Sequence, residues 1–429
     1  MTGADLAPPK RSIEDNRHGS LVRFGLSLLI EVPRFVAGFV TFSFLVLLLD
    51  PALYGQVGTM VAIAAIVGPI ATFGASWRML QRIVGSAAPK ADLSLAASVT
   101  VVGTLAGSVF VALVAPYLLR GTVDGTTVLI FLVGQVSCLW LLELTIVYTV
   151  GIGRLALGAV IRMTSTVIRI ATVIVFAVGS DHSVRSWVWH LTISMAASTV
   201  SAYVLLQRNS EGRVRWRQPS LAEFGEGIPY SLGSTTESFL AASDRPIMQR
   251  SGWEVATGTY AAGYRIITLA FVPLIALLKA HDRRVFTAGL DGIRPAYLAG
   301  KRVAKTATLL MLGVSVLVFL GATLLESILV SVRPEYEETA SVVRWLAVLP
   351  LVKAIQFSFG NVLTASREQT SRVKLTMAAT VVNIVGNVAF IPSGSWKAAV
   401  GTTLVAEAIL AASLWRACWK LAQASKGER

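Results

Sequence analysis

Long runs of apolar residues alternate with short polar connections along almost the whole chain. A run of about 18 or more apolar residues forms a helix that can cross a bilayer core of about 30 Å. Twelve such runs are predicted, at residues 21–49, 54–80, 93–119, 126–150, 155–179, 186–206, 224–249, 258–280, 303–330, 340–365, 373–391 and 398–421. The runs have the length of helices and lack apolar–polar alternation, so they do not fit barrel strands. The pattern predicts an all-α, polytopic membrane protein.

The charged residues predict how these spans are oriented. Lys and Arg near span ends favour the cytoplasmic side, and they concentrate in alternate connections when the N-terminus is placed inside. Both termini are then cytoplasmic in a multi-pass protein of the cell membrane. The predicted organisation is a tail at 1–20, an N-lobe of six spans at 21–207, a basic connection at 208–222, a C-lobe of six spans at 223–421 and a tail at 422–429.

The composition supports membrane insertion and excludes several other classes of protein. Of the 429 residues, 54% are hydrophobic and 14% are charged, whereas a soluble domain has about 25% charged residues. The net charge of +14 follows from the topology and from an anionic inner leaflet. No basic domain outside the membrane is expected to bind nucleic acid. The connection from His281 to Arg302 is the longest internal one and is expected to be an interfacial helix or loop.

Cysteines and histidines give no sign of a metal site or a disulfide framework. Cys138 and Cys418 both fall inside predicted spans, where they are most simply small apolar residues. The four histidines are scattered without paired spacing. We therefore expect no metal, no cofactor and no catalytic residues.

Prolines occupy matching places in the two predicted lobes. Pro33 lies in the first span and Pro69 in the second, while Pro229 lies in the seventh and Pro273 in the eighth. An internal proline frees a backbone carbonyl and permits bending, although membrane helices also tolerate proline without such a role. The matched placement predicts hinges at these four positions.

Basic residues inside the spans are the strongest functional signal. A charge at the bilayer centre costs about 2.5–3.5 kcal/mol on insertion scales, so such residues normally face protein or water. Arginine binds phosphate oxygens through a planar, permanently charged fork. The deep basic residues predict a cationic substrate site formed by Arg34, Arg162, Arg169, Arg265, Lys353 and Arg245. Arg78, nearer the inner surface, is instead expected to extend its side chain to the headgroups.

Three carboxylates inside the spans are candidates for ion coupling. Glu31 lies three residues before Arg34 on the same helix face, so it either neutralises that arginine or couples transport to H⁺ or Na⁺. Asp244 and Glu237 are the candidates in the seventh span, where Asp244 with Arg245 could equally be a structural ion pair.

Three stretches of the sequence carry a family resemblance. They are LLLDPALYG at Leu47–Gly55, the stretch Ser238–Ile266 that contains ASDRPIMQR, and Arg333–Pro350 together with Ala365–Pro392. They resemble the Wzx-like oligosaccharide and polysaccharide flippases of the multidrug/oligosaccharidyl-lipid/polysaccharide exporter superfamily. The resemblance covers nearly the whole chain after residue 20, with a departure at NVAFIPSGSWKAAVGTT, where that group usually has a tighter turn.

The resemblance implies a two-lobed bundle, like that of multidrug and toxin extrusion (MATE) transporters, around a central cavity. The implied activity is alternating-access transport of an undecaprenyl-diphosphate-linked oligosaccharide, not catalysis. The implied partners are this lipid-linked substrate, membrane lipids and a polysaccharide polymerase or other assembly proteins. A drug or cation exporter of the same superfamily and an integral-membrane lipid-sugar transferase remain alternatives. The first should prefer an acidic cavity, and the second needs an acid–base or metal constellation that the scattered carboxylates do not form.

Overall fold

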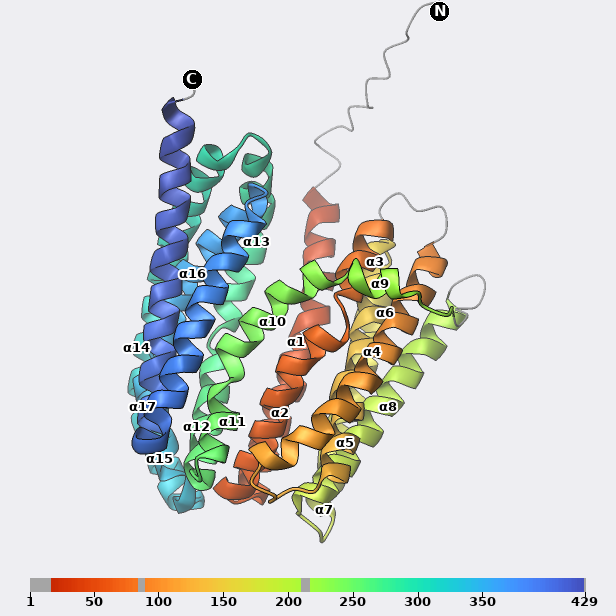
Figure 1. Ribbon diagram of the computed structural model, residues 1–429, viewed down its shortest axis with the longest axis vertical. Helices are drawn as coiled ribbons and strands as arrows, with labels where there is room; N and C mark the ends of the chain where they lie inside the picture. The colour runs from red at the N-terminus through yellow and green to blue at the C-terminus, as the bar shows by residue number, and fades with distance from the viewer. Residues whose placement is uncertain (1–16, 84–88, 210–216, 428–429) are drawn as a thin grey trace, which may run out of the picture.

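A computed structural model describes residues 17–83, 89–209 and 217–427. Most of the predicted N-terminal tail, the centre of the basic connection and the last two residues lie outside these ranges, as does the side chain of Glu31. Every regular element within the described residues is a helix. The helices run mainly along the long axis of the molecule and form two adjacent groups (Figure 1).

The first group is the N-lobe. Its elements are α1 (Arg17–Leu48), α2 (Pro51–Ala71), α3 (Ala75–Ile83), α4 (Pro89–Leu118), α5 (Gly125–Leu132), a π-helical segment (Val133–Cys138), α6 (Leu139–Gly151), α7 (Leu155–Val178) and α8 (Val184–Arg208). Three of these helices have a side-chain cap at the N-terminus. Asp50 accepts a hydrogen bond from the Leu53 N–H at the start of α2. Asp124 accepts a hydrogen bond from the Thr127 N–H at the start of α5. The hydrogen bonds that Thr127 donates hold the pKa of the Asp124 carboxyl below its ordinary value.

The second group is the C-lobe. Its elements are α9 (Leu221–Gly225), α10 (Ile228–Ala242), α11 (Asp244–Arg250), α12 (Glu254–Leu269), α13 (Val272–Leu290), α14 (Ile293–Val332), a 3-10 turn (Pro334–Tyr336), α15 (Glu337–Leu346), α16 (Leu349–Ala365) and α17 (Gln369–Gly427). The two predicted groups of spans thus correspond to two groups of helices, which confirms the all-α, two-lobed architecture.

The described helices account for most of the twelve predicted spans. Eight described helices are long and apolar enough to cross a membrane, and the pair α15–α16, bent by 46°, makes a ninth. Within α17 the backbone breaks at Ser395, and the Thr402 hydroxyl donates to the Asn387 side chain, so this helix folds back as two spans. The first and seventh predicted spans, α1 and α10–α11, are helical, but they are not long and apolar enough to count with these, so the total of twelve stays a prediction.

The structure gives the backbone of one predicted connection and of the four prolines. The segment from His281 to Arg302 is helical, with a break between the end of α13 at Leu290 and the start of α14 at Ile293, and its place at the membrane interface stays a prediction. Pro33 and Pro69 lie inside helices, whereas Pro229 and Pro273 lie in the first turns of α10 and α13, where a missing N–H costs nothing. A role as hinges stays a prediction for all four.

Helix α2 makes most of the contacts that join the lobes. It packs against α10, α11 and α12, and the approach is closest where its N-terminal part meets α12. A Cβ on Gly258 would collide with the Pro51 carbonyl, and one on Gly55 would lie 2.7 Å from the Glu254 carbonyl oxygen. Glycine at both positions lets the two backbones touch, which joins the lobes firmly at this end.

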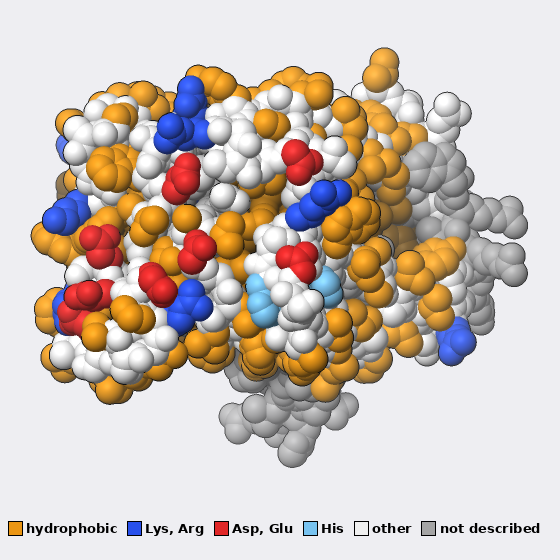
Figure 2. Space-filling view, turned by 90° about the horizontal axis from the view of Figure 1, so that it is seen from below, with side chains coloured by type: hydrophobic (Ala, Val, Ile, Leu, Met, Phe, Trp, Pro, Cys, Tyr) orange, Lys and Arg blue, Asp and Glu red, His pale blue; other side chains and the backbone are white. Residues whose placement is uncertain are grey.

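We name the ends of the molecule by the predicted orientation. The inner end carries α3, α9 and the start of α1, and the outer end carries the α1–α2 and α14–α15 connections (Figure 1). Viewed from the outer end, acidic and basic side chains lie on a face whose rim is largely hydrophobic (Figure 2). Many large apolar side chains on the sides of the bundle are also exposed, such as Phe110, Leu113 and Leu317. This distribution fits a multi-pass membrane protein surrounded by lipid.

Candidate functional site

Two of the predicted cations meet where the lobes adjoin. Arg34 lies on α1, and Gly38 follows one turn later on the same face. The Arg265 guanidinium, from α12 of the other lobe, lies directly against Gly38, in the place that a larger side chain would occupy. Arg34 and Arg265 interact electrostatically, and both are exposed. Glycine at position 38 thus lets a C-lobe arginine reach the α1 backbone.

Two further arginines project from one face of α7. Arg162 is only 5% exposed and forms an ion pair of 2.6 Å with Glu143 of α6. Arg169 is half-buried, and its Nε atom is buried without a hydrogen-bond partner. No described carboxylate forms an ion pair with Arg169. Arg265, Arg162 and Arg34 act on its charge, and Glu143 acts on it in the opposite direction from beyond ion-pair distance. The cluster of Arg34, Arg162, Arg169 and Arg265, called the arginine cluster below, spans both lobes.

Arg245 lies near this cluster but belongs to a compensated group in the C-lobe. Asp244 is 2% exposed, and its carboxylate accepts a hydrogen bond from the Tyr260 hydroxyl. The Arg245 Nε lies 3.4 Å from the same carboxylate, and the guanidinium stacks 4.7 Å from the centroid of the Tyr264 ring. Its charge also acts on Arg265. Arg245 therefore contributes to the field at the cluster while its own charge is balanced by Asp244.

Lys353 is the sixth predicted cation, and the structure gives it a carboxylate partner. Its Nζ lies 2.6 Å from Glu407 of α17, and Glu407 is fully buried. Glu237, predicted as an ion-coupling residue, has an exposed side chain and pairs with Arg372 at 2.7 Å. No role for Glu143, Glu407 or Tyr260 could be predicted from the sequence, because each acts through a partner on another helix.

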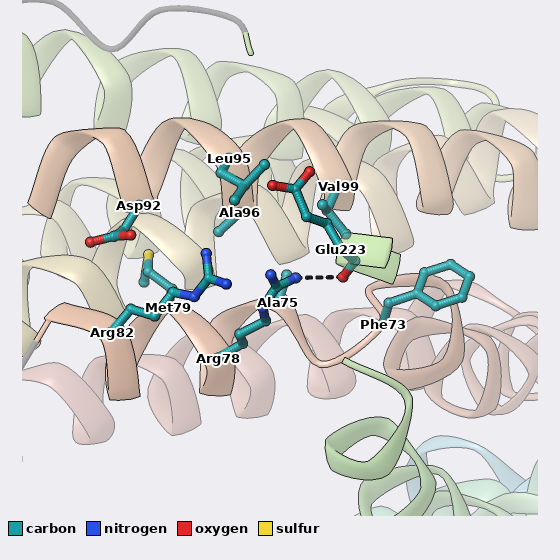
Figure 3. A pocket seen from close by; sticks show the side chains of 10 residues that line it. All are labelled: Phe73, Ala75, Arg78, Met79, Arg82, Asp92, Leu95, Ala96, Val99 and Glu223. Carbon is teal, nitrogen blue, oxygen red and sulfur yellow. Dashed lines mark hydrogen bonds between the residues drawn. The ribbon is translucent and has the colours of Figure 1, made fainter. Parts of the chain in front are cut away.

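The inner end is held together by a second set of polar contacts (Figure 3). Arg78 of α3 is mostly buried, forms an ion pair of 2.6 Å with Glu226, and donates to the Glu223 carbonyl oxygen. Arg82 contacts Glu226 at 3.1 Å. The expectation that Arg78 extends to the headgroups is therefore wrong, because the segment around α9 supplies carboxylate and carbonyl partners that the helix pattern could not reveal.

The outer end is closed by contacts between α1 and the segment after α14. Arg333 donates hydrogen bonds to the Leu47 and Leu49 carbonyl oxygens. The Tyr336 hydroxyl donates to the Leu49 carbonyl oxygen at 3.1 Å. Arg250 lies 4.2 Å over the ring of Tyr117 and ties α11 to α4. These contacts satisfy the free carbonyls at the end of α1 and join the lobes at this side.

Comparisons with known proteins identify the fold. No known protein family and no curated protein matches the chain by sequence. Among solved structures, the chain is similar to a multidrug resistance MATE family transporter of the MOP superfamily in an inward-facing conformation. The two sequences are 17% identical, and the alignment covers 94% of this chain and 98% of that chain with a TM-score of 0.74. The fold is therefore that of the exporter superfamily named above.

Two other solved structures share this fold. One is the lipid II flippase MurJ in an inward closed conformation, at 10% identity, with 91% of this chain and 87% of that chain covered and a TM-score of 0.70. The other is a MOP superfamily transporter from Pyrococcus furiosus Vc1, described as having a binding pocket of reverse polarity that suggests a different function. Its sequence is 14% identical, and the alignment covers 95% of this chain and 96% of that chain with a TM-score of 0.63.

Proposed function

We propose that the chain is a flippase that moves an undecaprenyl-diphosphate-linked oligosaccharide across the cytoplasmic membrane by alternating access. The observation that carries this proposal is the pair Arg169 and Arg265. They come from opposite lobes, repel each other, and have no ion-pair partner among the described carboxylates. Uncompensated cations at a lobe junction are costly unless a ligand supplies the counter-charge.

A diphosphate is the ligand that fits this arrangement best. Its oxygens accept several charge-assisted hydrogen bonds at once, and guanidinium groups donate them in pairs. An anion held between Arg169 of the N-lobe and Arg265 of the C-lobe would draw the lobes together. Such a ligand both binds the site and changes its shape, which is what alternating access requires.

The contacts at the outer end support a state that is closed to the outside. The outer end is closed by Arg333, Tyr336 and the glycine contacts of α2 with α12. Two of the similar solved structures are also inward conformations. We therefore propose that this conformation receives substrate from the inner leaflet and that outward release requires the Arg333 contacts to break.

Ion coupling forms part of the proposal through Asp244. Binding of H⁺ or Na⁺ at this buried carboxylate would compete with Arg245 and Tyr260 for its oxygens. Release of Arg245 would then increase the positive field at Arg265. Asp244→Asn should therefore retain anion binding but lose the dependence of transport on the ion gradient, measured in proteoliposomes with and without a gradient.

A drug or cation exporter of the same fold is the second candidate function. It is disfavoured because cationic substrates need an acidic site, whereas Arg169 and Arg265 of the arginine cluster have no ion-pair partner among the described carboxylates. An integral-membrane transferase is also disfavoured, since the buried carboxylates described here are separately paired with Arg162, Arg245 and Lys353.

Complementation of a flippase-deficient strain tests the proposed function. Arg34→Ala, Arg162→Ala and Arg265→Gln should each abolish complementation while membrane levels stay normal. Arg302→Gln is the matched control, because Arg302 is an exposed arginine near the inner end of α14. Full complementation by Arg34→Ala and Arg162→Ala together with Arg265→Gln would refute the cationic site.

A further inference from the structure

An apolar groove of about 480 Å³ lies at the junction of the lobes, in the outer half of the molecule. Its two walls are α1, with Phe42 and Val46, and α14, with Gly321 and Leu325. Residues of α12 and α15 form its floor, and Tyr336 lies at its outer end. We call this the lobe-junction groove. Its lining is almost wholly apolar, which excludes a sugar or an ion as its occupant.

The groove is continuous with the arginine cluster along one face of α1. Arg34, Gly38, Phe42 and Val46 follow one another at intervals of four residues, so they form one stripe on the helix. The Arg265 guanidinium lies against Gly38, and the next residue, Ile266, lines the groove. A single surface therefore changes from cationic at its inner part to hydrocarbon-like at its outer part.

We propose that the lobe-junction groove binds the isoprenoid chain of the lipid whose diphosphate occupies the arginine cluster. This inference rests on the proposed function and adds a second binding site to it. A hydrocarbon chain leaving a phosphate at Arg34 and Arg265 meets Phe42 and Ile266 next. The apolar area that it buries contributes favourable free energy in proportion to the contact made.

The direction of the groove indicates which lipid it takes. With the head at the arginine cluster and the chain toward the outer end, the ligand keeps the orientation of an inner-leaflet lipid. An outer-leaflet phospholipid would need its head at the outer end. There the Arg333 guanidinium is already bonded to the Leu47 and Leu49 carbonyls and to Glu335. The groove thus matches a substrate that is entering from the inside.

The open space in the groove allows a direct test. A Cβ at Gly321 has nothing within 4 Å, so Gly321→Phe would fill the groove without displacing packed atoms. Gly313, on the same helix and equally open, does not line the groove and provides the matched control Gly313→Phe. The full chain, purified in detergent, is titrated with undecaprenyl diphosphate and separately with inorganic pyrophosphate.

Gly321→Phe should weaken the binding of undecaprenyl diphosphate by about tenfold, which corresponds to losing roughly two buried methylene contacts. The binding of pyrophosphate should not change, and Gly313→Phe should alter neither ligand. Arg265→Gln should weaken both. If Gly321→Phe leaves undecaprenyl diphosphate binding unchanged while Arg265→Gln weakens both ligands, the groove proposal fails and the proposed function stands. If Arg265→Gln affects neither ligand, the proposed function fails.

Discussion

The cations that pair within the C-lobe differ from the cations that meet at the lobe junction in how their charge is compensated. In the C-lobe, Lys353 pairs with Glu407, and Arg245 is balanced by Asp244. At the lobe junction, Arg162 has Glu143, but Arg169 of the N-lobe and Arg265 of the C-lobe have no ion-pair partner among the described carboxylates. A buried pair can be purely structural, whereas an uncompensated cation persists where a ligand or water balances it. The difference separates charges that hold the fold from charges that bind substrate.

The largest expected effect concerns the C-lobe pair. Lys353→Met leaves the fully buried Glu407 without its cation, so the free energy of unfolding should fall by about 3–5 kcal/mol. Replacing both partners, as Lys353→Met with Glu407→Leu, should recover most of this loss. Thermal unfolding in detergent measures both variants. If Lys353→Met alone is as stable as the native chain, the pair is not structural.

The next effect concerns the N-lobe. Arg169→Gln should weaken pyrophosphate binding by about 10- to 100-fold, because a hydrogen bond to a charged group contributes about 1.5–3 kcal/mol. The unfolding temperature should stay the same or rise, since repulsion with Arg265 and Arg162 is relieved. A large fall in stability together with unchanged binding would assign Arg169 to the fold instead.

Glu143→Gln should change the affinity for pyrophosphate less than Arg169→Gln does, and in the opposite direction. Glu143→Gln removes the carboxylate that compensates Arg162, so the cluster becomes more positive. The free energy of unfolding should fall by about 1 kcal/mol, because the Arg162 guanidinium loses a charged partner. Pyrophosphate should bind several-fold more tightly in isothermal titration. Weaker binding would mean that Glu143 orients Arg162 toward the ligand rather than neutralising it.

The smallest effect concerns the outer end, where the lobes meet. Arg333→Gln removes guanidinium hydrogen bonds to the Leu47 and Leu49 carbonyls and should weaken the closed state by about 0.5–1.5 kcal/mol. Spin labels at Thr122 and Glu337, in a chain with both cysteines replaced by serine, should report a larger population of long distances. An unchanged distance distribution would exclude Arg333 as part of the outer closure.

The spans could be predicted from the sequence because a helix that crosses a membrane must be apolar over its whole length. The breaks in these spans could not be predicted from the sequence. The Leu346–Leu349 break precedes Pro350 within a continuous apolar run, and the reversal at Ser395 depends on a positive φ of 53°. Composition alone does not register such local backbone changes.

The candidate site was predicted only in part, for a physical reason. Depth and charge identified Arg34, Arg162, Arg169 and Arg265, which the structure brings together from three helices. The sequence could not distinguish them from Lys353, because compensation depends on which face of a distant helix points toward each cation. Glu407 lies 54 residues after Lys353 and Glu143 19 residues before Arg162, and neither spacing marks a pair.

The most direct test of the account is a double-mutant cycle on Arg169 and Arg265 with pyrophosphate as the ligand. If one anion bridges the lobes, each Gln variant binds more weakly, and the double variant loses less than the sum of the single losses, with a coupling of about 0.5–3 kcal/mol. Pyrophosphate binding that is unchanged in the double variant would contradict the central claim that these two arginines hold the anionic head of the substrate.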